Sequence, residues 1–203
     1  MEKATLVDGT ITMPTQSLTT FRSLQLPFLG AIIAAGALTL AGCSTGSSAS
    51  SSGSSQSTAN ELVGAGLSAQ QQGLYDEAQS DYQQAISKDK KNYYAEFDLG
   101  TIYQHDNDVS SAQGAYNAAL AINPKFQQAL YNLAVLDTAS NPQEAITLYD
   151  KVLALNPNDS SSNFNLGLLL IQTGSTASGH QYISTAIRLD PSLASRLPSG
   201  IQP

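Results

Sequence analysis

Few side chains of this 203-residue chain belong to the types that carry out covalent or metal chemistry. The sequence has one cysteine, Cys43, and two histidines, of which His105 opens the polar run His105-Asp106-Asn107-Asp108. A single cysteine rules out a disulfide framework and a metal site built from several cysteines. The polar run lies in an expected turn between two helices, and it lacks the Glu at the twelfth position that an EF-hand requires. We therefore expect no bound metal.

Other patterns that accompany catalysis are absent from the sequence or stand in the wrong setting. Residues 64–69 match the dinucleotide-binding pattern G-x-G-x-x-A, but they fall inside an expected helix rather than between a strand and a helix. The sequence contains no P-loop, no H-E-x-x-H motif and no G-x-S-x-G motif. We therefore expect no cofactor, no catalytic residues and no enzymatic activity.

The charge balance argues against two classes of partner. Lys and Arg number 9 and Asp and Glu number 16, which gives a formal net charge of -7 at pH 7. Nucleic acids and anionic lipid headgroups are bound by clustered cations, so the chain is expected to bind neither through surface charge. Hydrophobic residues make up 41% of the chain, which is enough to build a core.

The cysteine follows a long apolar segment. Residues 24–42 carry no charge and end in small side chains, in the order that is typical of a secretory signal. The residues Leu40, Ala41, Gly42 and Cys43 resemble the lipobox of bacterial lipoproteins. This resemblance implies that 1–42 is a signal peptide, that cleavage occurs before Cys43, and that its thiol receives a diacylglyceryl group. The protein would then be attached to a membrane by lipid on the extracytoplasmic face, periplasmic or cell-surface.

The same apolar segment leaves a second interpretation open. Its length is close to the roughly 17–25 residues that cross a bilayer as a helix, so it could serve as an uncleaved single-pass anchor with a cytoplasmic domain behind it. In either case residues 43–58 are expected to form a flexible Ser/Gly-rich linker. They carry no charge and no large apolar side chain that would offset the entropy of ordering.

A sequence period of 33 or 34 residues begins after this linker. The pair Leu99-Gly100 returns as Leu133-Ala134 and as Leu166-Gly167, and an aromatic residue stands two positions before each pair. Between these pairs, apolar residues recur at helical spacing, and no segment alternates between apolar and polar with a period of two. Prolines return in the same register, at Pro124, Pro157 and Pro191.

These recurring positions resemble the tetratricopeptide repeat, a helix-turn-helix unit of about 34 residues. The resemblance implies an all-α fold, a right-handed α-solenoid of about four helix-turn-helix repeats whose stacked pairs bury a continuous core. A domain over 59–193 is expected, followed by a tail over 194–203. Its four repeats would be 59–92, 93–126, 127–159 and 160–193.

In this family the first helices of the repeats build a concave groove that binds a peptide or a helix. None of the corresponding positions in this chain is Lys or Arg, so the groove is not expected to clamp a C-terminal carboxylate as chaperone-binding members do. Apolar and amide side chains instead suit an extended peptide or a helix with apolar anchors. The expected groove residues are Val63, Phe97, Asp98, Thr101, Tyr131, Asn132, Val135, Phe164, Asn165 and Leu168.

The function implied by both resemblances is that of a protein-protein interaction scaffold or adaptor in the bacterial cell envelope, held there by lipid, with a partner that the sequence does not identify. A structural alternative is self-association. Few residues follow the fourth repeat, so the helix near 182–189 is expected to leave an apolar face for the first repeat of a second copy. Such head-to-tail contacts build open chains.

Overall fold

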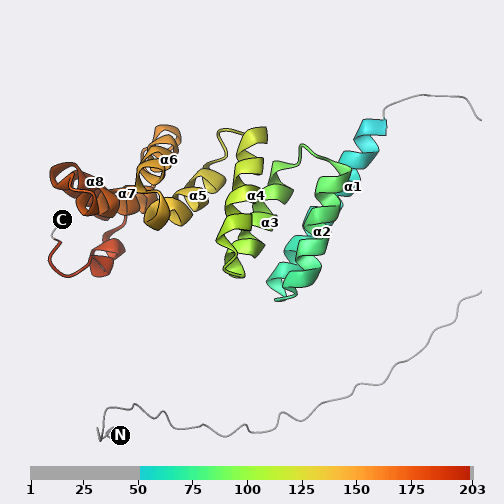
Figure 1. Ribbon diagram of the computed structural model, residues 1–203, viewed down its shortest axis with the longest axis horizontal. Coiled ribbons are helices and arrows are strands. Elements are labelled where there is room, and N and C mark those ends of the chain that lie inside the picture. Colours follow the sequence, from blue (N-terminus) through green and yellow to red (C-terminus); the bar gives the residue numbers. More distant parts are fainter. Residues whose placement is uncertain (1–50, 202–203) are drawn as a thin grey trace, which may run out of the picture. The chain divides into compact units, whose positions relative to one another are not determined.

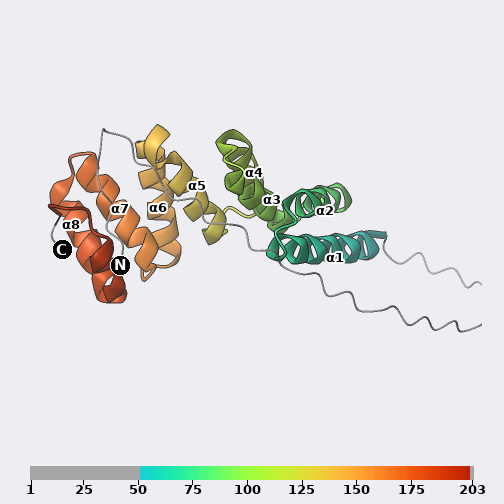
Figure 2. The ribbon, with the colours of Figure 1, turned by 90° about the horizontal axis from the view of Figure 1, so that it is seen from below.

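Four pairs of helices follow one another along the part of the chain that the structure describes. The computed structural model describes residues 51–201, with side chains from Ser55 onward. Each helix packs against its partner in the pair and then against the next pair, so that the pairs stand in chain order (Figures 1 and 2). The helices are α1 (Ser51–Gln71), α2 (Tyr75–Lys88), α3 (Tyr93–His105), α4 (Val109–Ile122), α5 (Gln127–Ser140), α6 (Pro142–Leu155), α7 (Ser160–Gln172) and α8 (Thr176–Leu189).

The predicted fold class is confirmed. Within residues 51–201 there is no strand, and the consecutive helix pairs stack as an all-α solenoid. The predicted signal peptide over 1–42 and the lipidation site at Cys43 lie outside the described residues and remain predictions. Among the helices that the structure describes, none combines the length and the apolar character that a membrane crossing needs.

The first helix begins earlier than the sequence indicated. The sequence predicts a flexible linker that includes residues 51–58, whereas the structure places these residues in α1, which is continuous from Ser51 to Gln71. Each residue added to an existing helix gains a backbone hydrogen bond, so an uncharged polar segment can prolong a helix that packing has already nucleated. Packing begins at Ala59, which is fully buried, and Asn92 donates a hydrogen bond to Asn60 at 3.2 Å.

Side chains of Asp and Asn start several of these helices. The Asn92 side chain accepts a hydrogen bond from the backbone N–H of Ala95 at 3.1 Å, and Asp108 accepts one from Ser111 at 3.1 Å. Asp159 does the same for Ser162 at 2.7 Å. These contacts satisfy N–H groups that have no partner inside the helix. They fix where α3, α4 and α7 begin.

The turns within the first, second and fourth pairs share one geometry. The middle residue of each has a positive φ, at Gly73 (77°), Asn107 (64°) and Gly174 (94°). The next residue donates to a carbonyl five positions earlier, as Asp108 does to Tyr103 at 2.9 Å, which is the Schellman arrangement. The turn within the third pair is shorter, because Asn141 alone separates α5 from α6.

Buried tyrosines on the second helices fill the core beside small residues on the first. Tyr82, Tyr116 and Tyr149 are almost fully buried and recur at the repeat period. A Cβ at Gly100 would lie 2.7 Å from Cε1 of Tyr116, so this glycine lets α3 and α4 approach closely. Ala134 occupies the corresponding position of the third pair.

A short 3-10 helix, η1 (Pro191–Arg196), follows α8 and covers part of the last pair. Its Leu193 is 3% exposed and belongs to one apolar cluster with Phe164 and Ala186. The guanidinium of Arg196 lies over the Phe164 ring, 5.5 Å from its centroid. The expectation of an open apolar face on the last helix is therefore corrected, because this turn packs on it.

Candidate functional site

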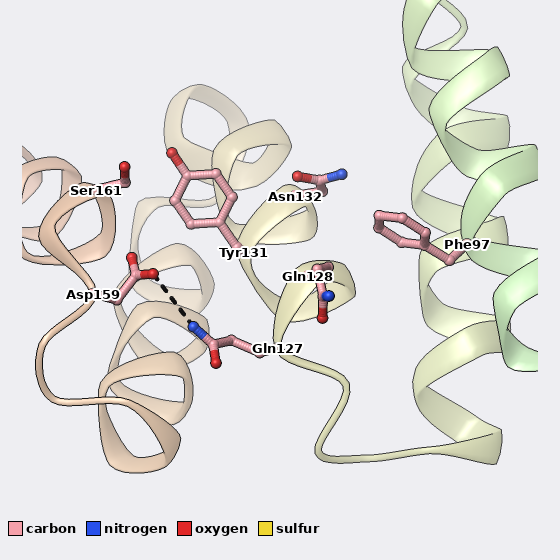
Figure 3. A pocket seen from close by; sticks show the side chains of 7 residues that line it. All are labelled: Phe97, Gln127, Gln128, Tyr131, Asn132, Asp159 and Ser161. Carbon is pink, nitrogen blue, oxygen red and sulfur yellow. Dashed lines mark hydrogen bonds between the residues drawn. The ribbon is translucent and has the colours of Figure 1, made fainter. Parts of the chain in front are cut away.

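A pocket of about 420 Å³ lies where the third, fifth and seventh helices meet. Figure 3 shows Phe97 of α3 on one side, Tyr131 of α5 in the middle, and Asp159 and Ser161 at the start of α7 on the other side. Gln127 donates a hydrogen bond to Asp159 at 3.3 Å across this pocket, which connects two consecutive pairs. The remaining lining residues are Gln128 and Asn132.

Three further pockets lie along the same odd-numbered helices, and we call the row of four the groove. They measure about 400, 480 and 290 Å³. Three of the four share lining residues, with Asp98 common to the 400 and 480 Å³ pockets and Phe97 common to the 480 Å³ pocket and the pocket of Figure 3. The 290 Å³ pocket, between α5 and α7, shares no lining residue with the others. The three are lined respectively by Asn60, Val63, Gly64, Leu67, Asn92, Tyr94 and Asp98; by Leu67, Gln70, Gln71, Tyr75, Phe97, Asp98 and Thr101; and by Val135, Thr138, Tyr149, Asn165, Leu168, Leu169 and Gln172.

The groove brings together most of the residues that the sequence predicted for it. Phe164 is the exception: it is 3% exposed and lines none of the four pockets. Its prediction as a groove residue is wrong, because Leu193 of η1 and Ala186 of α8 enclose it. The predicted residues that line the groove are Val63, Phe97, Asp98, Thr101, Tyr131, Asn132, Val135, Asn165 and Leu168.

Sequence reasoning missed the residues that enter the groove from helix starts. Asp159 caps α7, Ser161 stands in its first turn, and Tyr94 stands in the first turn of α3. The repeat pattern predicts only positions on the inner face of each first helix, whereas these residues lie at helix starts. The sequence signal for Tyr94 is the pair of consecutive tyrosines at a helix start. Neighbouring residues of a helix point in different directions, so both tyrosines cannot be buried on one face.

Tyr94 belongs to an aromatic cluster at the base of α3. Its ring lies 5.5 Å from Phe126 and 4.3 Å from Tyr93, and Phe97 lies 5.0 Å from Phe126. The two contacts with Phe126 are edge-to-face, an arrangement in which rings attract one another beyond the effect of area burial. Tyr94 is nevertheless 53% exposed. It therefore presents a fixed aromatic surface to the pocket that it shares with Val63 and Leu67.

Hydrogen bonds along the floor of the groove repeat from pair to pair. The Tyr82 hydroxyl donates to Gln70 Oε1 at 2.9 Å, and the Tyr116 hydroxyl donates to Gln104 Oε1 at 2.7 Å. Asn132 then donates to the Tyr116 oxygen at 3.1 Å. We call this series the polar ladder. Tyr116 is thereby held between side chains of two consecutive first helices, Gln104 of α3 and Asn132 of α5.

The last step of the polar ladder uses the next copy of the same asparagine. Asn165 donates to the hydroxyl oxygen of Tyr131 at 3.0 Å, so it joins α7 to α5. Burial raises the pKa of Tyr116 to about 12 and also raises that of Tyr149. These phenols therefore stay protonated and keep their hydrogen bonds across the physiological range.

The groove is lined by acidic and neutral side chains. Asp98 stands at the position of Asn132 and Asn165 one repeat earlier, and burial raises the pKa of its carboxyl to about 6. None of the residues that line the four pockets is Lys or Arg. In the part of the chain that the structure describes, Lys151 lines a separate pocket formed mainly by α4 and α6. The walls of the groove therefore carry no basic side chain.

The polar run at 105–108 is a helix-ending turn. His105 stacks on Tyr75 with ring centroids 3.8 Å apart, and its Nδ1 lies 3.1 Å from a carboxylate oxygen of Asp106. Asp108 is the cap of α4. Over residues 51–201 no three His, Cys, Asp or Glu side chains come close enough together to hold a metal ion.

Comparison with known families gives a match over most of this solenoid. Models described as tetratricopeptide repeat match residues 63–125, 128–159 and 148–181. Among curated proteins, the photosystem I assembly protein Ycf3 of Cyanophora paradoxa is 36% identical over 83 residues. That alignment covers 39% of this chain and 48% of the relative, so the match spans about half the length of Ycf3.

Solved structures share the architecture at lower identity. MamA is 21% identical with a TM-score of 0.61, over 68% of this chain and 81% of that one. The first tetratricopeptide repeat domain of Spaghetti (RPAP3), bound to the HSP90 peptide SRMEEVD, is 24% identical with a TM-score of 0.56. It covers 58% of this chain and 94% of that domain. At these identities the likeness concerns the fold.

Proposed function

Since this chain is a tetratricopeptide repeat protein, we propose that it works as an adaptor that binds an extended segment of a partner protein in the groove. The observation that carries this proposal is the row of four pockets along α1, α3, α5 and α7, three of which share lining residues. Apolar walls alternate there with amide and hydroxyl groups. Such a surface can anchor side chains of an extended peptide and also hydrogen-bond its backbone.

Hydrogen bonds within the protein order the groove before any ligand binds. The polar ladder fixes Tyr116 and Asn132, and the bond from Gln127 to Asp159 fixes the edge of the Figure 3 pocket. A surface that is ordered before binding loses less conformational entropy when a partner docks. This rigidity favours recognition of a flexible peptide over docking of two mobile surfaces.

We further propose that the domain is displayed on the extracytoplasmic face of a bacterial membrane by lipid on Cys43. Support comes from the residues Leu40, Ala41 and Gly42 before the cysteine and from the apolar segment over 24–42. More than one acyl chain is needed for firm attachment, which the chemistry of bacterial lipoproteins supplies. The adaptor would then gather envelope proteins close to that surface.

Binding in the groove is tested by closing one pocket. Ser161 is exposed and lines the pocket of Figure 3, so Ser161→Arg places a long cationic side chain inside it. The matched control is Asn117→Arg, which puts the same side chain at an exposed position of α4 outside the groove. Partner capture from the native cells should fail with Ser161→Arg and persist with Asn117→Arg. Equal capture by both variants would place the binding surface elsewhere.

The lipid anchor is tested by Cys43→Ser in the native cells. Lipidation predicts that this variant is neither acylated nor cleaved before residue 43, which metabolic labelling with a fatty acid and mass spectrometry of the mature N-terminus both report. An uncleaved single-pass anchor predicts the same uncleaved N-terminus and the same membrane attachment for both proteins. That second result would contradict the lipid anchor.

Self-association through the last repeat is not part of this proposal. That alternative needs an exposed apolar face on the last helix pair, and in the described structure Leu193 packs against that pair.

A further inference from the structure

The first step of the polar ladder differs from the later steps. At the position where the third and fourth first helices carry Asn132 and Asn165, α3 carries Asp98. Both asparagines use their amide N–H to donate to a tyrosine oxygen, at 3.1 and 3.0 Å. An ionised carboxylate has no hydrogen to donate, so it cannot take this role.

The neighbouring groups do not supply Asp98 with a donor either. The Tyr82 hydroxyl hydrogen is engaged by Gln70, and the amide N–H of Gln70 reaches Thr101 at 3.4 Å. The Thr101 hydroxyl donates to the backbone oxygen of residue 98 at 2.7 Å, away from the carboxylate. Within the described residues, no hydrogen bond or ion pair holds the Asp98 side chain.

Asp98 also lies at the junction of two pockets with apolar walls. One side is formed by Val63, Leu67 and Tyr94, and the other includes Tyr75 and Phe97. A half-buried carboxylate between such walls loses much of its hydration, and burial accordingly raises its pKa. A cation brought by a ligand would replace the missing water and would be only weakly screened there.

We propose that the groove selects a peptide whose Lys or Arg side chain pairs with Asp98, with an apolar side chain of the same peptide seated on each side of it. One apolar side chain contacts Tyr94 and Val63, and the other contacts Phe97 and Tyr131. This inference rests on the proposed peptide binding in the groove. Its preferred ligand is basic, whereas the HSP90 peptide bound by the Spaghetti domain contains the acidic run EEVD.

The spacing of the ligand follows from the spacing of the helices. Neighbouring packed helices lie about 8–10 Å apart, and an extended peptide advances about 3.3 Å per residue. The pocket of Tyr94 lies between α1 and α3, and the pocket of Tyr131 lies between α3 and α5. The two apolar anchors should therefore be separated by about three residues, with the basic residue between them.

The test is selection of short random peptides displayed on phage against the full chain and its variants. The native chain should enrich peptides with Lys or Arg between apolar residues. Asp98→Asn should keep the apolar preference and lose the basic one, because the amide carries no charge to pair with Lys or Arg. The variant should remain folded, since the asparagine can donate to Tyr82 as Asn132 does to Tyr116. Ser161→Arg should abolish selection of both kinds.

The affinity of a synthetic peptide from this selection measures the contribution of its basic residue. Replacing its lysine by norleucine should weaken binding about tenfold on the native chain and less than about twofold on Asp98→Asn. Basic residues enriched equally by Asp98→Asn would overturn the assignment to Asp98. Apolar peptides selected without basic residues would overturn the inference and leave groove binding intact. Failure to select any peptide that Ser161→Arg rejects would overturn both.

Discussion

Replacing Asp98 with asparagine should stabilise the free protein at neutral pH. The carboxylate is half-buried, it has no hydrogen-bond partner within residues 51–201, and its later copies are Asn132 and Asn165. Burial raises the pKa of Asp98 from 3.8 to about 6. The folded state therefore holds the proton more tightly than the unfolded chain, and ionisation at neutral pH opposes folding.

The size of this effect follows from the shift in pKa. A rise of about 2 units corresponds to about 3 kcal/mol of unfavourable ionisation free energy at about 1.36 kcal/mol per unit. Asp98 keeps part of its surface in water, and solvent screening reduces this to about 1–2 kcal/mol. The stability that protonation contributes is fully present below about pH 4 and is lost as the pH rises through about 6. Asp98→Asn should therefore gain about 1–2 kcal/mol near pH 7.5 and almost nothing near pH 4.

Urea unfolding followed by far-UV circular dichroism measures both values. The reciprocal control is Asn132→Asp, which introduces a carboxylate beside Tyr116 and removes the hydrogen bond that Asn132 donates. It should lose stability near neutral pH and recover part of it in acid. If Asp98→Asn is as stable as the native chain at both pH values, or is less stable at neutral pH, the carboxylate is not the unpaired group described here.

Three further predictions follow from other parts of the structure. A lysine-containing groove peptide should bind about tenfold more weakly near pH 5 than near pH 7.5 by fluorescence anisotropy, because Asp98 takes up a proton. Tyr82 and Tyr116, which face Asp98, stay protonated over this range because burial raises their pKa. Asp98→Asn should therefore abolish the pH dependence of binding. Asn107→Ala should cost about 1 kcal/mol in urea unfolding, because φ is 64° at this residue, whereas Asn107→Gly should cost nothing. Leu193→Ala should cost about 2 kcal/mol and should increase hydrogen exchange in α7 and α8, since Leu193 covers Phe164; unchanged exchange there would show that η1 does not stabilise the last pair.

The fold could be predicted from the sequence because several independent signals coincide at one period. The recurring Leu-Gly or Leu-Ala pairs, the buried tyrosines and the prolines each return after 33 or 34 residues, and each has a distinct structural cause. Small residues permit close helix packing, tyrosines fill the space beside them, and proline ends a helix. The structure shows Gly100 against Tyr116 in this way.

The two ends of the solenoid were harder to predict than its middle. The polar residues 51–58 carry no periodic signal, yet they continue α1 as far back as Ser51. At the other end, Pro191 opens a 3-10 turn that returns Leu193 onto Phe164. Phe164, placed in the groove by its repeat position, is thereby buried by the last residue of the fourth repeat.

The groove was predicted where side chains project from the middle of a first helix, as for Tyr131 and Asn132. It was missed where a cap or a first-turn residue enters from the side, as for Asp159 and Tyr94. The exceptional character of Asp98 appears only when its hydrogen bonds are compared with those of its later copies. Sequence alone gives the residue type, whereas the unpaired state is a property of the assembled side chains.

The central claim, that a partner binds in the groove, is tested most directly by site-specific photocrosslinking in the native cells. A photoreactive residue at Gln128 would stand on the exposed wall of the Figure 3 pocket, and one at Asn117 would stand on α4 outside the groove. A partner crosslinked from Gln128, absent from Asn117 and lost when Ser161→Arg is added would be the result that the groove predicts. A partner crosslinked from Asn117 and absent from Gln128 would contradict it.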